Sequence, residues 1–285
     1  MSGEQRRPTV TRRREVGHAS ARSLLMTLLG EFVLPRDEPV WTSALLAALA
    51  MFGVEAKSAR QALARAAAEG WLSSERAGRR ACWSLTAPGR RLLTEGARRI
   101  YEFGRERGEW DGRWLILMVS VPESQRGLRH RVRTQLSWAG FGSPAPGVWV
   151  SPHASQQAEA ARILSGAGLA AAAMSFVARY GEIGDEDTLV ARSWDLAAVE
   201  QRYEDFIDEF APVVPSSGGE ALRAQTRLVH EWRRFPFLDP QLPARLLPPD
   251  WSGAKAADLF HGKHADWHPA AQRHWDELSR SGSAG

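Results

Sequence analysis

The sequence predicts an α+β protein built from successive parts, and three observations lead to that prediction. In roughly the first 90 residues, apolar residues recur at helical spacing and are then followed by short strand-like runs. Between residues 111 and 190, strand-like and helical segments alternate. The rest of the chain shows helical spacing interrupted by prolines. A chain of 285 residues has room for two or three domains.

The composition is that of a globular protein, with 44% apolar and 25% charged residues. The single cysteine, Cys82, excludes an internal disulfide and a zinc site built from several cysteines. Charge is distributed unevenly, because residues 1–110 carry 19 Arg and Lys against 12 Asp and Glu, whereas residues 111–285 carry 18 against 21. A basic first third is typical of a module that binds a polyanion, although a coding bias toward arginine explains the same excess.

Nothing in the sequence predicts a membrane protein. No apolar run approaches the roughly 20 residues of a transmembrane helix, and the polar N-terminus lacks the apolar stretch of a secretory signal. We therefore expect a cytoplasmic protein with no membrane contact. Residues 1–18 are predicted to be a disordered basic arm, which either follows DNA into a minor groove or stays a solvated tail.

Residues 19–88 are predicted to form a winged helix-turn-helix domain. Helical spacing predicts a first helix over residues 19–33 and a second one that starts at Thr42 as its N-cap. A third helix is expected to start at Ser58, since Ser58 and Gln61 have the spacing of a capping box. Short helices in this order, with a glycine turn before the third, are typical of a helix-turn-helix.

Strand-like runs over residues 71–76 and 80–86 predict a basic hairpin after the third helix. That helix has a basic exposed face suited to a DNA major groove, where Arg60 would reach guanine and Gln61 adenine. The hairpin arginines would contact phosphates. An ordinary solvated helix face has the same charge spacing. The predicted DNA-binding residues are Lys57, Ser58, Arg60, Gln61, Arg65, Arg76, Arg79 and Arg80.

A connector helix over residues 89–110 and a ferredoxin-like (split βαβ) domain over residues 111–190 are predicted next. The domain's strands are expected at residues 114–121, 147–151 and 171–178, and its helices at residues 124–138 and 156–164. This fold carries many functions and selects none of them. Several arginines on its first helix either reach DNA, bind a ligand phosphate or form a solvated face: Arg126, Arg129, Arg131 and Arg133.

Residues 191–285 are predicted to form a mainly helical C-terminal domain. Its helices are expected at residues 195–210, 220–234, 256–259 and 269–278.

Catalysis has little support in this sequence, and we predict no catalytic residue, cofactor or metal. Three histidines have spacing that a metal site can use but lack a carboxylate or cysteine at convincing spacing: His261, His264 and His268. The acidic run Asp185–Asp187 is interpreted as a hairpin tip. The alternative function is a metal-dependent nuclease on the ferredoxin-like domain, with Glu123 near the end of the first strand and the winged helix as targeting module.

The chain resembles the PaaX family, bacterial repressors of phenylacetate catabolism, over most of its length. The resemblance is carried by residues 110–114, residues 192–196 with Tyr203, residues 230–243 and residues 246–251. It implies a winged helix, a ferredoxin-like domain and a helical domain for ligand binding and dimerisation. It also implies a homodimer on a palindromic double-stranded DNA operator, released by an aromatic acyl-CoA such as phenylacetyl-CoA.

An acyl-CoA needs cations for its phosphates and an apolar pocket for its ring, and one stretch of the C-terminal part supplies both residue types. The ligand-binding candidates are His230, Trp232, Arg233, Arg234 and Phe235. The alternative role of the two arginines is to stabilise the fold through carboxylate pairs, for example with Asp239.

Overall fold

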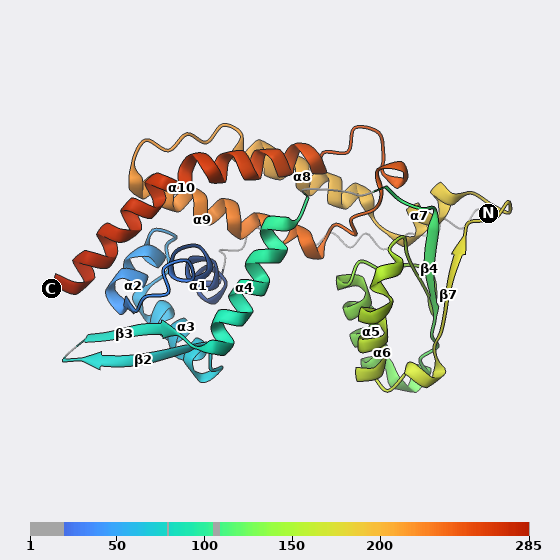
Figure 1. The fold of residues 1–285 in the computed structure, drawn as a ribbon, viewed down its shortest axis with the longest axis horizontal. Coiled ribbons are helices and arrows are strands. Elements are labelled where there is room, and N and C mark those ends of the chain that lie inside the picture. The colour runs from blue at the N-terminus through green and yellow to red at the C-terminus, as the bar shows by residue number, and fades with distance from the viewer. Residues whose placement is uncertain (1–19, 79, 105–108, 285) are drawn as a thin grey trace, which may run out of the picture.

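Figure 1 shows a computed structural model that describes residues 20–78, 80–104 and 109–284. The described chain is a mainly helical α+β protein with two small antiparallel sheets, so the predicted class is confirmed at this level. In Figure 1 the N-terminal helices and a protruding hairpin lie at one end, and the second sheet lies at the other. Helices α8 (Leu196–Phe210), α9 (Gly218–Trp232) and α10 (Gly253–Ala284) extend between the two ends. The predicted arm, residues 1–18, lies outside the described residues.

The N-terminal unit combines helices with a small sheet. Its helices are α1 (Ala21–Leu28), continued by a π-helical turn at Leu29–Val33, α2 (Thr42–Ala50) and α3 (Ala56–Ala68). Its strands are β1 (Val40–Trp41), β2 (Leu72–Ala77) and β3 (Arg80–Leu85), in the order β1-β3-β2. Strand β1 was not predicted, because a strand of two residues carries no recognisable alternation.

Two predicted helix caps are wrong. Helix α3 begins at Ala56 with Glu55 at the N-cap position, so Ser58 lies inside the first turn and forms no capping box with Gln61. Thr42 is the first residue of α2 rather than its N-cap, and its hydroxyl donates to the carbonyl of Ala81 at 2.9 Å. Residue spacing predicted the cap at Ser58 and residue type the cap at Thr42, whereas the backbone is already helical before Ser58 and the Thr42 hydroxyl bonds to the hairpin.

The core of the N-terminal unit is completed by the C-terminal helices. Leu25 and Leu45 are fully buried there, together with Leu222 of α9 and Trp275 of α10. The ring of Phe32 stacks on the ring of Trp275, with 5.1 Å between ring centroids. The first and last parts of the chain therefore share one core.

The connector helix α4 (Ala87–Glu102) is shorter than the predicted helix over residues 89–110. Phe103 adopts an extended backbone, and its ring packs edge-on against Trp232 with 5.6 Å between centroids. Gly104 follows with φ of +80°, a conformation that favours glycine. The helix therefore ends where Phe103 enters the core of the C-terminal helices.

The central unit is a four-stranded antiparallel sheet with the order β5-β6-β4-β7. Its strands are β4 (Arg113–Met118), β5 (Gly142–Ala145), β6 (Val148–Ser151) and β7 (Met174–Arg179). Its helices are α5 (Arg126–Trp138) and α6 (Gln157–Gly166), with 3-10 turns at Glu123–Gln125, Ala154–Gln156 and Ala170–Ala172. Strand β5 was missed, because Gly142 and Pro144 are unusual in strands.

The two faces of this sheet pack against different parts of the chain. Leu115 and Leu117 of β4 pack with Leu136 of α5 and Ile163 of α6. On the opposite face, a second cluster joins residues of β4 and β6 to helix α7 (Glu186–Ser193) and to the coil near the C-terminal helices: Trp114, Val150, Val190, Leu242 and Leu246. The sheet therefore connects its own helices to the C-terminal part of the chain.

Helix α7 (Glu186–Ser193) occupies the segment that was predicted to be a hairpin tip, so that prediction is wrong. The Asp185 carboxylate accepts hydrogen bonds from the backbone N–H groups of Asp187 and Thr188, which makes it an N-cap. Glu186 accepts a hydrogen bond from Trp114 Nε1 at 2.8 Å and pairs with Arg245. These acids are therefore bound to protein groups in a capping and bridging arrangement.

The C-terminal helices are α8 (Leu196–Phe210), α9 (Gly218–Trp232) and α10 (Gly253–Ala284), with 3-10 turns at Phe235–Phe237 and Ala244–Leu246. Two short helices were predicted where α10 is one helix, with Pro269 inside it. Buried residues before and after Pro269, including Phe260 and Trp275, hold both halves against their neighbours and outweigh the hydrogen bond that proline cannot donate. No helix in the described part of the chain combines the length and apolar character needed to cross a membrane.

Candidate nucleic-acid interface and ligand cavity

Helix α3 presents one face to the core and the opposite face to solvent. Ala59, Leu63 and Ala66 are buried. The predicted DNA-binding residues of this helix are all exposed: Lys57, Ser58, Arg60, Gln61 and Arg65. Because Gln61 takes part in no capping box, its amide is available to an outside partner.

The exposed face of α3 keeps its positive charge unpaired. Among the described residues, neither Arg60 nor Arg65 makes an ion pair or a side-chain hydrogen bond. The nearest acid along the chain after the helix, Glu69, pairs with Arg22 of α1 at 2.6 Å. Two free guanidinium groups on a face of small side chains can approach a phosphate backbone or the edge of a guanine.

The β2–β3 hairpin protrudes beyond the helices in Figure 1. Its strands pair from Leu72 opposite Leu85 to Ala77 opposite Arg80. Arg76 is exposed, whereas Arg80 is half-buried and its guanidinium lies 5.9 Å from the centroid of the Trp41 ring. Arg79 lies outside the described residues.

The base of the hairpin is fixed to α2 and α4. Trp83 Nε1 donates to Thr42 Oγ1 at 2.9 Å. The Thr86 side chain caps α4 by accepting from the backbone N–H of Gly89, and the backbone N–H of Thr86 donates to the carbonyl of Trp71 at 3.1 Å. A Cβ added at Gly89 would lie 2.1 Å from the Trp71 carbonyl oxygen, so α4 starts in direct backbone contact with the segment between α3 and β2.

The five predicted ligand-binding residues lie at the end of α9 and just beyond it, and most of them belong to the packing of the C-terminal helices. Trp232 is fully buried, and its ring stacks on the ring of Phe260 with 4.7 Å between ring centroids. Phe235 is buried and stacks on Tyr203 at 4.3 Å.

The charged members of this set are committed to other protein groups or to burial. Burial and the charge of Arg233 lower the pKa of His230 to about 4, so this imidazole is neutral at neutral pH, and its Nδ1 lies 3.1 Å from Thr27 Oγ1. Arg233 is half-buried, and its guanidinium donates to Ser23 Oγ of α1. Arg234 pairs with Glu231 at 2.8 Å. This packing favours a structural role for the set, and none of its members lines the cavity described next.

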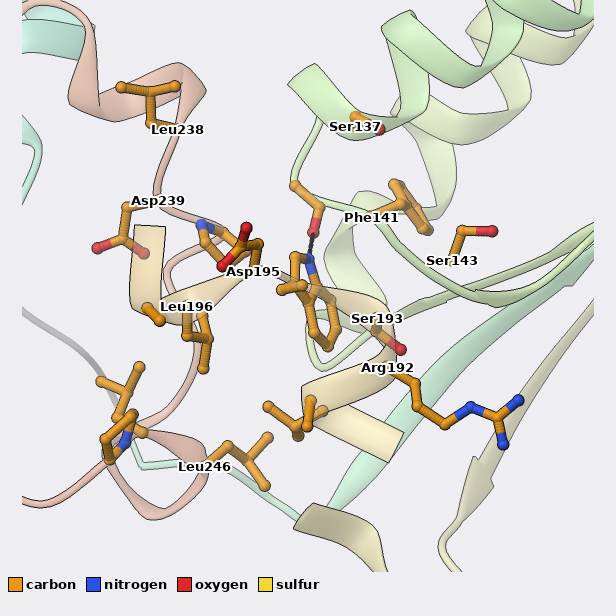
Figure 2. Close-up of a pocket in the computed structure, with 18 of the residues that line it drawn as sticks. Ser137, Phe141, Ser143, Arg192, Ser193, Asp195, Leu196, Leu238, Asp239 and Leu246 are labelled. Carbon is orange, nitrogen blue, oxygen red and sulfur yellow. Dashed lines mark hydrogen bonds between the residues drawn. The ribbon is translucent and has the colours of Figure 1, made fainter. Parts of the chain in front are cut away.

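A cavity of about 890 Å³ lies where the central unit meets the coil between α9 and α10. Figure 2 shows Leu238 and Asp239 on one wall and Ser137 and Phe141 on the other. The α7–α8 junction forms the floor, where Trp194 Nε1 donates to the carbonyl of Gly140 at 3.2 Å. The sequence named Arg133 as one possible binder of a ligand phosphate, but it did not predict the site as a whole, because the walls come from segments that are far apart in the chain.

The alternative metal and nuclease sites find no support. No group of three or more His, Cys, Asp and Glu side chains has an arrangement suited to a metal ion in the described part of the chain. His264 contacts the buried carboxylate of Glu31 at 3.0 Å instead. Glu123 begins a 3-10 turn after Pro122, and its side chain lies outside what the structure describes.

Glu31 is the centre of a buried hydrogen-bonded cluster that joins four helical segments. Its carboxylate accepts from Gln225 Nε2 at 2.9 Å, from Tyr101 Oη and from His264 Nε2. Burial raises the pKa of this carboxyl, but the hydrogen bond and charge of His264 and the donors Tyr101 and Gln225 outweigh it and hold the pKa below its ordinary value. The cluster links the π-helical turn of the N-terminal unit to α4, α9 and α10.

The geometry defines a protein in which a basic helix-and-hairpin unit is joined to an antiparallel-sheet unit and a helical unit that borders a cavity. Comparison with known proteins identifies the family. The model of the "PaaX-like protein" matches residues 20–89, that of the "PaaX protein central Cas2-like domain" matches residues 107–190, and that of the "PaaX-like protein C-terminal domain" matches residues 194–277. The chain belongs to the PaaX family.

Two individual relatives agree with this assignment. The Transcriptional repressor PaaX of Escherichia coli (strain K12) is 34% identical over 263 residues, which cover 88% of this chain and 82% of that protein. A solved structure, the uncharacterized protein Rv0674 from Mycobacterium tuberculosis, aligns with a TM-score of 0.61 and 23% identity, covering 91% of this chain and 99% of that one. The second likeness concerns the fold alone.

Proposed function

We propose that this protein is a DNA-binding transcriptional repressor of the PaaX type and that its N-terminal unit is a winged helix-turn-helix. The observation that carries the proposal is the exposed face of α3, where Arg60 and Arg65 pair with no other described residue, beside a protruding basic hairpin. The curated relative is a transcriptional repressor, which supports the same function and a regulator rather than an enzyme. Such a protein acts on DNA in the cytoplasm.

In the proposed complex, α3 enters a major groove of double-stranded DNA. Arg60 lies near the N-terminal end of the helix, where a bidentate contact to guanine is favourable, and Gln61 lies beside it for adenine. Lys57, Ser58 and Arg65 contact phosphates along the edges of the groove. Arg76, Arg79 and Arg80 of the hairpin contact the neighbouring backbone or the minor groove.

An electrophoretic mobility shift with a DNA fragment from the gene's own upstream region tests the proposal. We expect the wild type to bind and the double variant Arg60→Ala/Arg65→Ala to bind about 100-fold more weakly, since each contact contributes about 1–3 kcal/mol. A matched control removes two exposed arginines from the C-terminal helices, Arg202→Ala/Arg223→Ala, and should bind as the wild type does. Unchanged binding by the α3 variant would refute the recognition-helix assignment.

We also propose that the central unit is a ferredoxin-like domain and that the protein is a homodimer on a palindromic operator. The connectivity β4-α5-β5-β6-α6-β7 and the strand order support the fold. Strand β7 is an edge strand that carries exposed Met174 and Phe176, next to exposed Met118 of β4, which supports a protein contact there. The mass in solution tests the dimer: Phe176→Lys should shift it toward a monomer, and a monomeric wild type would refute the proposal.

The family resemblance extends the proposal to an effector, an aromatic acyl-CoA such as phenylacetyl-CoA, that releases the protein from DNA. An effector shifts the equilibrium only by its difference in affinity for the two states of the protein. Phenylacetyl-CoA added to the DNA complex should abolish the shift, and a complex that persists at saturating phenylacetyl-CoA would refute this effector. No resident cofactor or metal is part of the proposed function.

A further inference from the structure

We propose that the cavity between α5, the α7–α8 junction and the coil after α9 binds the aromatic, anionic effector, and that Phe237 and Arg99 transmit its presence to the DNA-binding unit. The inference rests on the proposed function, because it assigns a site to that effector. It replaces the sequence-based candidates at residues 230–235, whose side chains are mainly occupied by packing.

The cavity contains exposed aromatic surface that core packing does not use. The side chain of Trp138, at the end of α5, is 63% exposed, and that of Phe237, in the coil after α9, is 44% exposed. Both line the cavity, and their rings form an edge-to-face pair with 6.4 Å between centroids. An aromatic ring that lies against this pair would bury apolar surface and gain ring–ring contacts.

The charged residues of the cavity favour an anion. Among the described residues, Arg133 and Arg192 make no ion pair or side-chain hydrogen bond, and both line the cavity. Of the three acids that line the cavity, Asp239 accepts from Tyr203 Oη at 2.7 Å and Asp195 caps α8, which leaves Asp187 in the first turn of α7. The Arg192 side chain points away from the floor of the cavity in Figure 2. It would therefore contact the outer part of a long ligand and not the aromatic ring of that ligand.

The size of the cavity favours a ligand larger than one ring. Its volume of about 890 Å³ lies in the upper part of the usual range for small-molecule pockets, roughly 300–1,000 Å³. An aromatic acyl group on the Trp138–Phe237 pair would leave room for a phosphate-bearing tail that passes Arg133. A free aromatic carboxylate shares the ring and the negative charge but not the tail, so the two sources can be separated experimentally.

The walls of the cavity are built to keep it open. The ring of Trp194 lies so close to Gly142 that a Cβ added there would be 2.5 Å from Cε2 of that ring. Prolines at positions 236, 240, 248 and 249 restrict the backbone of the coil that forms the opposite wall. A preformed cavity loses little free energy to ordering when a ligand enters.

A direct contact joins this cavity to the DNA-binding unit. The guanidinium of Arg99, on α4, lies 5.1 Å from the centroid of the Phe237 ring. Helix α4 begins in backbone contact with the segment that joins α3 to β2, through Thr86, Gly89 and Trp71. A ligand that changes the position of Phe237 therefore changes a contact of the helix that carries the hairpin, and Arg99 acts as a positioning residue between the two sites.

Isothermal titration calorimetry with the full chain in the absence of DNA tests the site, with phenylacetyl-CoA, CoA and phenylacetate as probes. We expect phenylacetyl-CoA to bind most tightly and Trp138→Ala to weaken it about tenfold, with little effect on CoA. Arg133→Gln should weaken phenylacetyl-CoA and CoA alike by roughly tenfold. Arg131→Gln, an exposed arginine on another face of α5, is the matched control and should bind as the wild type does.

Three outcomes of the calorimetry would overturn the site. They are wild-type affinity for phenylacetyl-CoA in Trp138→Ala, equal effects of Arg133→Gln and Arg131→Gln, and no binding of any probe to the wild type. Tighter binding of phenylacetate than of phenylacetyl-CoA would overturn the phosphate-bearing tail. Since no DNA is present, none of these results depends on whether the protein is a repressor.

The coupling is tested with Arg99→Ala, a residue that does not line the cavity. We expect this variant to bind both phenylacetyl-CoA and the DNA fragment with wild-type affinity but to need at least tenfold more phenylacetyl-CoA for release. Release at the wild-type concentration would refute the role of Arg99. Failure of the wild type to bind DNA would instead refute the proposed function, while the calorimetric result would still report on the cavity.

Discussion

Replacing Tyr101 with phenylalanine should lower the free energy of unfolding by about 2 kcal/mol at neutral pH. The Tyr101 hydroxyl donates to the carboxylate of Glu31, which is only 6% exposed. A hydrogen bond to a charged group contributes about 1.5–3 kcal/mol. Gln225 and His264 still contact the carboxylate in the variant, so the loss stays below the roughly 3–5 kcal/mol expected when a buried charge loses its partner altogether.

The effect of this substitution should depend on pH in a defined direction. The pKa of Glu31 is lowered in the folded protein, so its ionised form contributes stability above the ordinary pKa of 4.5 and loses it as the pH falls through the folded value. The Tyr101 hydroxyl favours the ionised form. The difference in free energy of unfolding between wild type and variant should therefore be largest at neutral pH and should decrease as the pH falls below 4.5.

Urea unfolding followed by circular dichroism, at about pH 7 and about pH 3.5, measures both effects. The matched control is Tyr180→Phe, because the Tyr180 hydroxyl makes no hydrogen bond to another described residue and its removal should change the midpoint little. A Tyr101→Phe variant as stable as the control, or a difference that does not change with pH, would refute the account of the Glu31 cluster.

Further substitutions test the packing around the cavity and at the end of α9. Because burial lowers the pKa of His230 to about 4, stability should fall by up to about 3 kcal/mol as the pH drops from 6.5 toward 4, and His230→Asn should remove this loss in urea unfolding. Tyr203→Phe should cost about 2 kcal/mol in the same assay, since its hydroxyl donates to buried Asp239 at 2.7 Å. Gly142→Ala should cost about 1–3 kcal/mol and change the near-UV circular dichroism, because the new methyl group would displace Trp194. A wild-type stability that does not change between pH 6.5 and 4 would contradict the account of His230. An unchanged urea midpoint in Tyr203→Phe would contradict its bond to Asp239, and an unchanged near-UV spectrum in Gly142→Ala would contradict the contact with Trp194.

The elements that the sequence predicts well are those whose own residues decide their structure. The basic exposed face predicted for α3 is confirmed, because Arg60, Gln61 and Arg65 are exposed. The small apolar residues on the opposite face, Ala59, Leu63 and Ala66, are buried in the core. The apolar run around Leu115 and Leu117 predicted a buried strand, since its length suits a strand and Pro122 follows it, and both leucines are buried.

Other elements depend on partners that are distant in the chain. The helix through Pro269 exists because Trp275 and Phe260, on either side of it, are both buried against other helices. Likewise, the boundary of α4 is set by Phe103, which leaves the helix to pack on Trp232. A window of neighbouring residues contains neither of these contacts.

The ligand-site prediction shows how residue type can mislead. Arginines and aromatic residues near position 233 have the chemistry of an acyl-CoA site, but helical spacing also places Trp232 in line with Leu222 and Val229, and that stripe is buried. This periodicity is typical of a helix face that is buried in a core. The cavity itself combines three separate segments, and although the sequence singled out Arg133, residues 192–196 and residues 246–251, nothing in their spacing indicates that they meet.

The shared core of the first and last helices has a consequence for the order in which this chain is made. Leu25 and Phe32 emerge early in synthesis, but Trp275, which completes their core, is made about 240 residues later. Until then the N-terminal unit exposes apolar surface that only the end of the chain can cover. A nascent or truncated chain should therefore aggregate rather than occupy an operator, and competence to bind DNA would depend on translation having passed Trp275.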